Sequence, residues 1–126
     1  MIPGQYPIVI WRGGTWSVGL QQTLLDFSSY DEIRMQIRPP FVRGIPKKAA
    51  LLELTLTNGR VTLEDDNSTL RLTISAADTR DLPFNEGVYD LELVKHVDLT
   101  ATPSIPEEVV DKLLFGSVVV KGEQTV

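Results

Sequence analysis

The side chains that could hold a metal ion are acidic, because the chain has one histidine, His96, and no cysteine. Carboxylate and amide oxygens are the ligands that calcium prefers. Asp65, Asp66 and Asn67 follow one another and could offer such oxygens. Three more aspartates could join them after folding: Asp78, Asp81 and Asp90. Their spacing matches no calcium-binding loop, so we interpret the run as a solvated acidic turn and predict no metal and no other cofactor.

Residues for nucleophilic catalysis are equally sparse. Ser28, Ser29 and Thr15 carry hydroxyls, but none lies in the glycine-flanked sequence of a nucleophile elbow. His96 has no second histidine to act with and is expected at the surface near a strand end. The lack of cysteine removes thiolate chemistry and disulfides. The sequence therefore predicts no enzymatic activity.

Aromatic and basic residues near predicted turns are better candidates, for contacts with other proteins. Trp11 and Trp16 flank Arg12-Gly13-Gly14, and large aromatic or arginine side chains beside an exposed turn can anchor an interface. Trp16 is expected to cover the core between two sheets, whereas Trp11 could face the core or a partner. A single Arg-Gly-Gly copy is interpreted as a turn, not as a nucleic-acid-binding segment. Trp11 and Arg12 are therefore interface candidates.

A second candidate surface lies at residues 39–48, PPFVRGIPKK, which contain three prolines and a glycine. This composition predicts an exposed basic loop. Arg38, Phe41 and Arg43 could form an interface there, since Phe41 is apolar on an otherwise polar loop. The alternative is that the Phe41 ring folds back onto the edge of the domain.

Length and composition predict one globular domain over residues 1–126, of which 42% are hydrophobic and 23% charged. The net charge of −5 works against non-specific binding to nucleic-acid phosphates. No apolar run approaches the ~20 residues of a membrane helix. The first residues lack the basic start of a signal peptide. We therefore expect a protein that is made in the cytoplasm and binds neither membranes nor nucleic acid.

Alternating apolar and polar residues predict β-strands. The clearest runs are residues 32–38, 52–57, 69–75 and 88–94. Their predicted inward residues include Ile33, Met35, Ile37, Leu70, Leu72, Ile74, Tyr89, Leu91 and Leu93. Further strands are expected at 8–11, 15–20 and 60–64, and a last one from 109 or 112 to 121 is favoured over a helix at 106–114. Because strands of this kind hide one face only against another sheet, the predicted fold is an all-β antiparallel sandwich of seven to eight strands.

Prolines, glycines and polar residues mark the connections. Residues 1–7 are predicted to be an extended N-terminal arm, and residues 39–48 and 95–108 long surface loops. Asn58-Gly59, between two alternating runs, predicts a β-hairpin with a type I′ turn. Residues 75–82 predict one helical turn. The side chain of Ser75 or Asp78 could cap the first backbone amides of this turn.

Residues 78–93, DTRDLPFNEGVYDLEL, resemble the tyrosine corner of immunoglobulin-like domains. In that motif an Asp-containing turn leads to a strand whose tyrosine hydroxyl bonds back to upstream backbone. The resemblance implies that Tyr89 is this tyrosine and Asp78 the acidic residue of the turn. Leu91 stands where antibody domains carry their second cysteine, so the domain is not of antibody type.

A wider resemblance covers the chain from about Ile8 to Val126. Its segments are WRGGTWSVGL, DFSSYDEIRMQIR, LELTLTNGRVTL, TLRLTISAADTRDLPFNEGVYDLEL and LLFGSVVVKGEQTV. Together they are similar to small bacteriophage and prophage β-sandwich proteins, among them tail and baseplate components such as the N-terminal domain of upper baseplate proteins. The chain departs from that family's pattern at 39–48 and 95–108, which could carry contacts peculiar to this protein.

This resemblance implies an immunoglobulin-like, non-enzymatic structural protein of a bacteriophage particle. It would be located in the virion as a tail, baseplate or tail-fibre-attachment protein, docked to other virion proteins in several symmetry-related copies. One alternative is a carbohydrate- or receptor-binding module, which needs Trp11, Trp16 or Tyr30 on one exposed face. Another is a capsid decoration or neck protein, which differs only in its partner.

Overall fold

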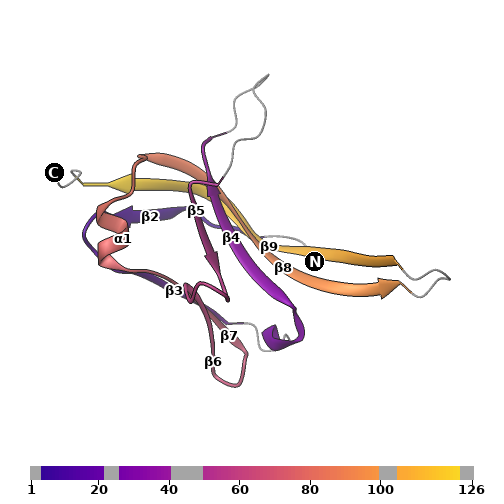
Figure 1. Cartoon of the computed structure of the whole chain (residues 1–126). Coiled ribbons are helices and arrows are strands. Elements are labelled where there is room, and N and C mark those ends of the chain that lie inside the picture. The colour runs from indigo at the N-terminus through magenta and orange to yellow at the C-terminus, as the bar shows by residue number, and fades with distance from the viewer. Residues whose placement is uncertain (1–3, 22–25, 41–49, 100–104, 123–126) are drawn as a thin grey trace.

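The computed structural model describes residues 4–21, 26–40, 50–99 and 105–122, with the backbone alone over 97–99 and 105–108. In these residues two β-sheets enclose a common apolar core, as in a β-sandwich (Figure 1). The larger sheet has six strands and the smaller has three. The prediction of a β-sandwich is confirmed at this level, with nine strands in the described residues.

The larger sheet is mixed. Its strands are β1 (Gly4–Gln5), β2 (Ile8–Trp11), β4 (Glu32–Arg38), β5 (Leu52–Thr55), β8 (Glu86–Leu99) and β9 (Ile105–Lys121). The order is β1-β9-β8-β4-β5, and β2 also pairs with β9. Strands β1 and β2 run parallel to β9, which corrects the prediction of a wholly antiparallel sandwich.

The parallel pairing follows from burial. The register places Ile8 beside Val118 and Ile10 beside Val120, and all four side chains are buried. Part of the predicted N-terminal arm is therefore a strand, because Gly4 and Gln5 continue the same edge.

The smaller sheet is antiparallel, in the order β3-β7-β6. Its strands are β3 (Trp16–Gln21), β6 (Val61–Glu64) and β7 (Thr69–Ile74). The inward residues of its central strand face those of the larger sheet. The inward residues named above from the alternating runs all belong to the buried core: Ile33, Met35, Ile37, Leu70, Leu72, Ile74, Tyr89, Leu91 and Leu93.

Two short helical elements complete the described structure, the 3₁₀-helix η1 (Phe27–Ser29) and α1 (Ala76–Arg80). The Ser75 side chain accepts a hydrogen bond from the Asp78 amide, with 3.2 Å between Oγ and N. The predicted helical turn and its Ser75 cap are therefore confirmed.

The predicted hairpin at Asn58-Gly59 is wrong. Strand β5 pairs with β4 in the larger sheet, whereas β6 pairs with β7 in the smaller one. Only Gly59 of the pair has a positive φ, 79°, so the turn is not type I′. The chain crosses between the sheets here because Leu54 and Val61 are then buried from opposite sides of the core.

The prediction that residues 95–108 form a surface loop is also wrong for its described parts, 95–99 and 105–108, while residues 100–104 lie outside the described structure. Residues 95–99 and 105–108 belong to β8 and β9, which pair from Glu86 with Val119 to Leu99 with Ile105. The helix considered for residues 106–114 is not adopted, because pairing with β8 holds that segment extended. Of the other predicted loop, residues 39–48, only Pro39 and Pro40 are described, and neither is in a strand.

Candidate protein-interaction surfaces

The outer face of the larger sheet carries a row of exposed apolar side chains. Val9 and Trp11 alternate with the buried residues of β2 and so point outward. Val88 of β8 pairs with Ser117 of β9, and Phe115 lies two residues before Ser117 on the same face. Val9, Trp11, Val88 and Phe115 are all exposed, and we call them the apolar strip. Large apolar side chains grouped in this way mark interaction sites more often than scattered ones do.

Trp11 is the most exposed member of the strip, with 60% of its surface accessible. The Lys121 ammonium lies 5.6 Å from its ring centroid, a cation–π contact worth ~0.5–1 kcal/mol at an exposed site. Trp16 instead packs against the core and is half-buried, as expected from the sequence. Trp11 is thus placed as an exposed aromatic, the property that made it an interface candidate.

Beyond Phe115 the same face is polar and its charges are paired. Lys112 Nζ lies 3.4 Å from Asp90 Oδ1. Arg34 Nε donates to Glu92 Oε1 at 3.2 Å. These contacts satisfy charged groups within the chain, so this half of the face offers fewer free groups to a partner than the apolar strip does.

The outer face of the smaller sheet is different, since its described residues include no exposed large apolar side chain. The Arg71 guanidinium lies across it, donating to Glu64 at 2.7 Å and to Ser17 at 3.1 Å. A Cβ on Gly19 would lie 2.9 Å from Arg71 Nη2, so the glycine makes room for this side chain. This face is a solvated polar surface.

Arg12, an interface candidate, has most of its donors occupied within the chain. Its guanidinium donates to Phe84 O at 2.9 Å, Asn85 Oδ1 at 2.8 Å and Gly122 O at 2.6 Å, with longer contacts of 3.4 Å to Leu82 O. It therefore ties the end of β2 to the segment before β8 and to the end of β9. Its role in the described contacts is structural, beside the exposed Trp11.

Of the second predicted surface, only Arg38 is described. It pairs with Val88 across β4 and β8, so it borders the apolar strip. One terminal nitrogen donates to Gln36 Oε1, while Nε is buried without a hydrogen-bond partner among the described residues. Phe41 and Arg43 lie outside the described residues.

Tyr89 is buried in the core, and its hydroxyl donates to an upstream backbone carbonyl, that of Tyr6, at 2.5 Å. This partner lies in the N-terminal segment, which runs along β9, whereas in immunoglobulin-like domains it lies a few residues before the tyrosine. Burial is the main cause that raises the pKa of Tyr89 to about 12. Gly116 permits this approach, since a Cβ there would be 2.5 Å from the same Tyr6 oxygen.

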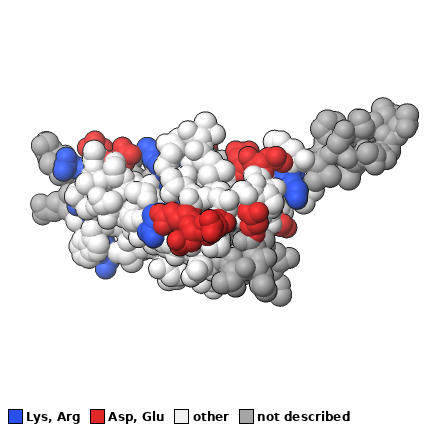
Figure 2. Space-filling view, turned by 90° about the horizontal axis from the view of Figure 1, so that it is seen from below, with Lys and Arg blue, Asp and Glu red and all other residues white. Residues whose placement is uncertain are grey.

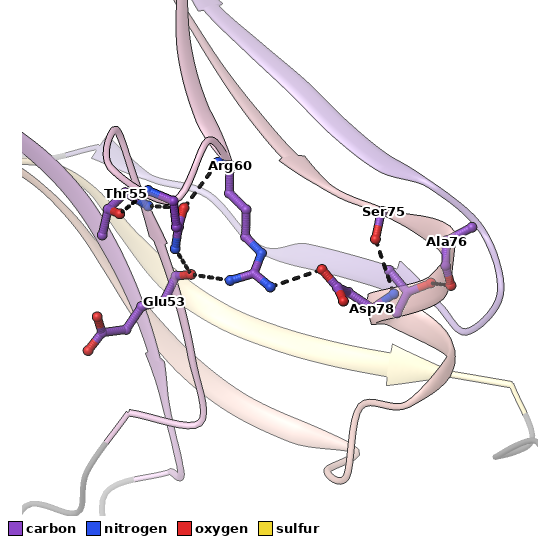
Figure 3. Close-up of polar contacts among 8 residues, drawn as sticks. Glu53, Thr55, Arg60, Ser75, Ala76 and Asp78 are labelled. Atoms are coloured by element: carbon purple, nitrogen blue, oxygen red, sulfur yellow. Dashed lines mark hydrogen bonds and ion pairs between the residues drawn. The ribbon is translucent and has the colours of Figure 1, made fainter.

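Asp78, the second residue of the predicted corner, binds Arg60. Its Oδ2 accepts from Arg60 Nη2 at 2.9 Å, and Arg60 Nη1 donates to the Glu53 carbonyl at 3.1 Å (Figure 3). Hydrogen bonding from Arg60 is the main cause that lowers the pKa of Asp78. Arg60 thus connects β5 of one sheet with α1, which follows β7 of the other.

The residues considered for metal binding lie mostly in the β6–β7 turn. Asp65, Asp66 and Asn67 all have positive φ, from 52° to 67°. Glu64 and the two aspartates are exposed, and Figure 2 shows acidic side chains gathered on the side of the molecule where this turn lies. Within the described ranges, no three acidic or histidine side chains are arranged to hold a metal ion.

The residues considered for catalysis have local structural contacts. The Ser28 hydroxyl donates to the Asp26 carboxylate at 2.6 Å and the Ser29 hydroxyl to the Asp26 carbonyl at 2.8 Å. The same carboxylate caps η1 by accepting from the Ser28 amide at 2.9 Å. His96 is exposed in β8, and its backbone amide donates to Asp31 Oδ2 at 2.6 Å. No helix in the described part of the chain is long and apolar enough to cross a membrane.

A two-stranded arm is the other candidate surface. Strand β4 ends its pairing with β8 at Glu32 and Val94, but β8 and β9 continue together to Leu99 and Ile105. Residues 95–99 and 105–109, which we call the arm, therefore extend past the sandwich as a hairpin (Figure 1). In the described residues no third strand pairs with the arm. Exposed Val109 and Val110 lie at its base.

Sequence reasoning missed Val9, Val88, Phe115 and the arm. A usable signal was present in residues 8–11, Ile-Val-Ile-Trp, which are apolar on both faces of a strand. A strand that is apolar on both faces is typically covered on both sides. Val88 gave no such signal, since Glu86 and Asp90, two residues to either side of it, are acidic. Phe115 follows Leu113 and Leu114, a run that is likewise apolar on both faces.

No family model matches this chain, and a search among curated proteins finds no match either.

Proposed function

We propose that this protein is a non-enzymatic structural component of a bacteriophage particle, an immunoglobulin-like domain that docks to other virion proteins. The station in best agreement with the sequence resemblance is the tail, as a baseplate or tail-fibre-attachment protein present in several symmetric copies. Its partners are then proteins, with no role for nucleic acid or membranes.

Strand order supports the immunoglobulin-like assignment. Such domains place the second, fifth and fourth strands in one sheet and the third, sixth and seventh in the other. If β3 is taken as the second strand, β3-β7-β6 has the first arrangement and β4-β8-β9 the second. Strand β5 then extends the larger sheet as in variable-type domains, and β1 and β2 supply the first strand.

The observation that carries the docking proposal is the arm. A two-stranded hairpin is marginally stable by itself in water, and folded domains use three or more strands or a covering element. The arm extends from the sandwich with paired backbone but, in the described residues, without a third strand. Contact with another protein would supply the missing neighbour, and the exposed Val109 and Val110 at its base suit such a contact.

Particles offer a direct test. Phage particles from the source strain are purified by density gradient, and their proteins are identified by mass spectrometry. We expect the chain to be present in the particles. A variant with residues 96–108 replaced by Asn-Gly, which closes the hairpin at the Lys95–Val109 pair, should fold but no longer remain with particles.

The Trp11→Ala variant, made in the chain whose arm is not shortened, tests the apolar strip in the same particle preparation. Failure to find the chain in any particle fraction would contradict the proposed function. Retention of the shortened variant at the wild-type level would contradict the role given to the arm.

The receptor-binding alternative has less support. Sugar-binding surfaces on sandwiches use exposed aromatic rings, and of the three residues considered only Trp11 is well exposed. Trp16 and Tyr30 are partly buried and pack against the core. A capsid decoration or neck protein would share the fold and the docking mode, and the particle fraction that retains the chain distinguishes that station from the tail.

A further inference from the structure

The open edges of the two sheets differ in how well they are protected against another strand. At the β5 edge, side chains already bind the backbone. The Glu53 carbonyl accepts from Asn58 Nδ2 at 2.9 Å and from Arg60 Nη1 at 3.1 Å, and the Thr55 amide donates to Asn58 Oδ1 at 3.0 Å (Figure 3). An incoming strand would have to displace these bonds, so the β5 edge is blocked.

Two other edges also carry features that discourage strand addition. The β1–β2 edge is interrupted at Pro7, which has no amide hydrogen to donate. Strand β6 has four residues and is bounded by the charged side chains of Arg60 and Glu64. Short strands, prolines and charges are the devices by which proteins protect sheet edges.

Strand β3 lacks all of these devices. Its six residues, Trp16–Gln21, include no charge and no proline, and among the described residues only β7 pairs with it. The groups on its open side can be identified from the ladder. The Thr73 amide donates to the Arg60 carbonyl at 2.9 Å, so Thr73 faces away from β3 and Ser17–Thr73 is a non-hydrogen-bonded pair. Ser17, Gly19 and Gln21 therefore direct their amides and carbonyls to the open edge.

The inward side chains of β3 are also incompletely covered. Trp16, Val18 and Leu20 are all half-buried. In the neighbouring β7, Leu70, Leu72 and Ile74 are at most 2% exposed. A strand placed beside β3, with apolar side chains directed inward, would complete this coverage.

Charge places little demand on the strand that fits. Gln21 pairs with Thr69, which pairs with Glu64, so the acidic β6–β7 turn lies on the far side of β7 from the open edge. Three strand spacings of ~4.8 Å separate Glu64 from an incoming strand, which exceeds the Debye length at physiological salt. The Glu64 carboxylate is also paired with Arg71 at 2.7 Å, so apolar side chains and backbone groups, not charge, select the incoming strand.

We infer that the open edge of β3 accepts one extended segment of another protein, with apolar residues at alternate positions that cover Trp16, Val18 and Leu20. The segment becomes a fourth strand of the smaller sheet, held by backbone hydrogen bonds to Ser17, Gly19 and Gln21. A single segment is enough for this site, since the three outward residues Ser17, Gly19 and Gln21 offer the backbone groups for one strand. The inference rests on the proposed docking function and identifies one of its surfaces.

The probe is a synthetic peptide, acetyl-KTVTVTVTK-amide, compared with acetyl-KTVPVPVTK-amide, whose prolines remove amide donors. Hydrogen exchange of the backbone amides is followed by NMR on the full chain. We expect the first peptide to slow exchange at Ser17, Gly19 and Gln21 by about tenfold or more, and the second to leave it unchanged.

Protein variants test the same edge. Ser17→Pro removes an outward amide but no backbone bond to β7. Ser17→Ala is its control, because both variants lose the hydroxyl that binds Arg71 and only Ser17→Pro also loses the amide. We expect Ser17→Ala to bind the peptide and Ser17→Pro to lose binding, with the amides of Trp16 and Leu20 still protected as evidence of folding. If Ser17→Pro does not fold, Gln21→Pro against Gln21→Ala makes the same comparison at the strand end.

Three results would overturn the inference: no slowing in the wild type, equal binding by the Pro and Ala variants, or protection of the three edge amides by self-association that dilution removes. These measurements use no particle. Absence of the chain from phage particles would therefore contradict the proposed function without deciding the peptide result, and the peptide result can fail while the chain is still found in particles.

Discussion

The hydrogen bond between Tyr89 and the Tyr6 carbonyl predicts an unusual dependence of stability on pH. The Tyr89 hydroxyl donates to that oxygen at 2.5 Å, and the ring is buried. Tyr89→Phe removes the donor and keeps the ring. A hydrogen bond of this kind contributes about 1 kcal/mol to the free energy of unfolding. At neutral pH we therefore expect the variant to be less stable by about that amount, a fall in Tm of roughly 3–5 °C.

At alkaline pH the wild type is expected to become the less stable of the two proteins. Burial raises the pKa of Tyr89 to about 12, whereas an unfolded tyrosine ionises near pH 10. The folded state therefore holds the proton more tightly, and this contribution is present below pH ~10 and lost as pH rises towards ~12. The loss amounts to roughly 2–3 kcal/mol in the wild type and is absent from Tyr89→Phe. The two stability curves should cross near pH ~11.

Urea unfolding at a series of pH values measures the two stability curves. Fluorescence of Trp11 and Trp16 reports the unfolding transition. The difference between wild type and variant is the relevant quantity, because other groups titrate equally in both. Tyr6→Phe is the matched control at neutral pH: it removes a tyrosine hydroxyl but leaves the accepting carbonyl, so it should match the wild type there. At alkaline pH it should depart from the wild type far less than Tyr89→Phe does, because burial, which it keeps, is the main cause of the raised pKa of Tyr89 and the charge of Tyr6 a smaller one. Parallel curves for wild type and Tyr89→Phe from neutral pH to pH ~12 would refute the reasoning.

Two further predictions concern the segment that β9 holds. Gly116→Ala puts a Cβ 2.5 Å from the Tyr6 oxygen. It should lower the free energy of unfolding by ~1–3 kcal/mol in denaturation measurements and speed amide exchange at β1. Gly14→Ala, whose Cβ would have its nearest atom 3.5 Å away, should show neither effect. Arg12→Met removes the bonds to Phe84, Asn85 and Gly122 and should lower the free energy of unfolding by about 2 kcal/mol, while Arg80→Met, at an exposed site, should change it little. Equal effects within either pair would contradict the structural role assigned to that residue.

Sequence alone determined which way most strand residues point. Ile33, Met35 and Ile37 face the core as predicted, because successive side chains of any strand leave on opposite faces. The Ser75 cap was equally predictable, since it depends on a hydroxyl and an amide three residues apart. Absence of a catalytic arrangement was an expectation from composition and stays one.

Tertiary structure decided which strands are neighbours. The sequence around Asn58-Gly59 is that of a local hairpin, yet the chain places β5 and β6 in different sheets, because burial of Leu54 and Val61 from two sides outweighs a local turn preference. In the same way, pairing with β8 made residues 105–108 a strand where prolines and acidic residues suggested a loop or helix.

The candidate surfaces were decided at this level too. Val9, Val88 and Phe115 come from strands distant in sequence and become one strip only through the register of β2, β9 and β8. The open edge of β3 likewise exists because β1 and β2 pair with β9 instead. Alternation is a property of the local backbone and can be read from neighbouring residues. Strand partners depend on apolar burial summed over the whole chain, which no single segment contains.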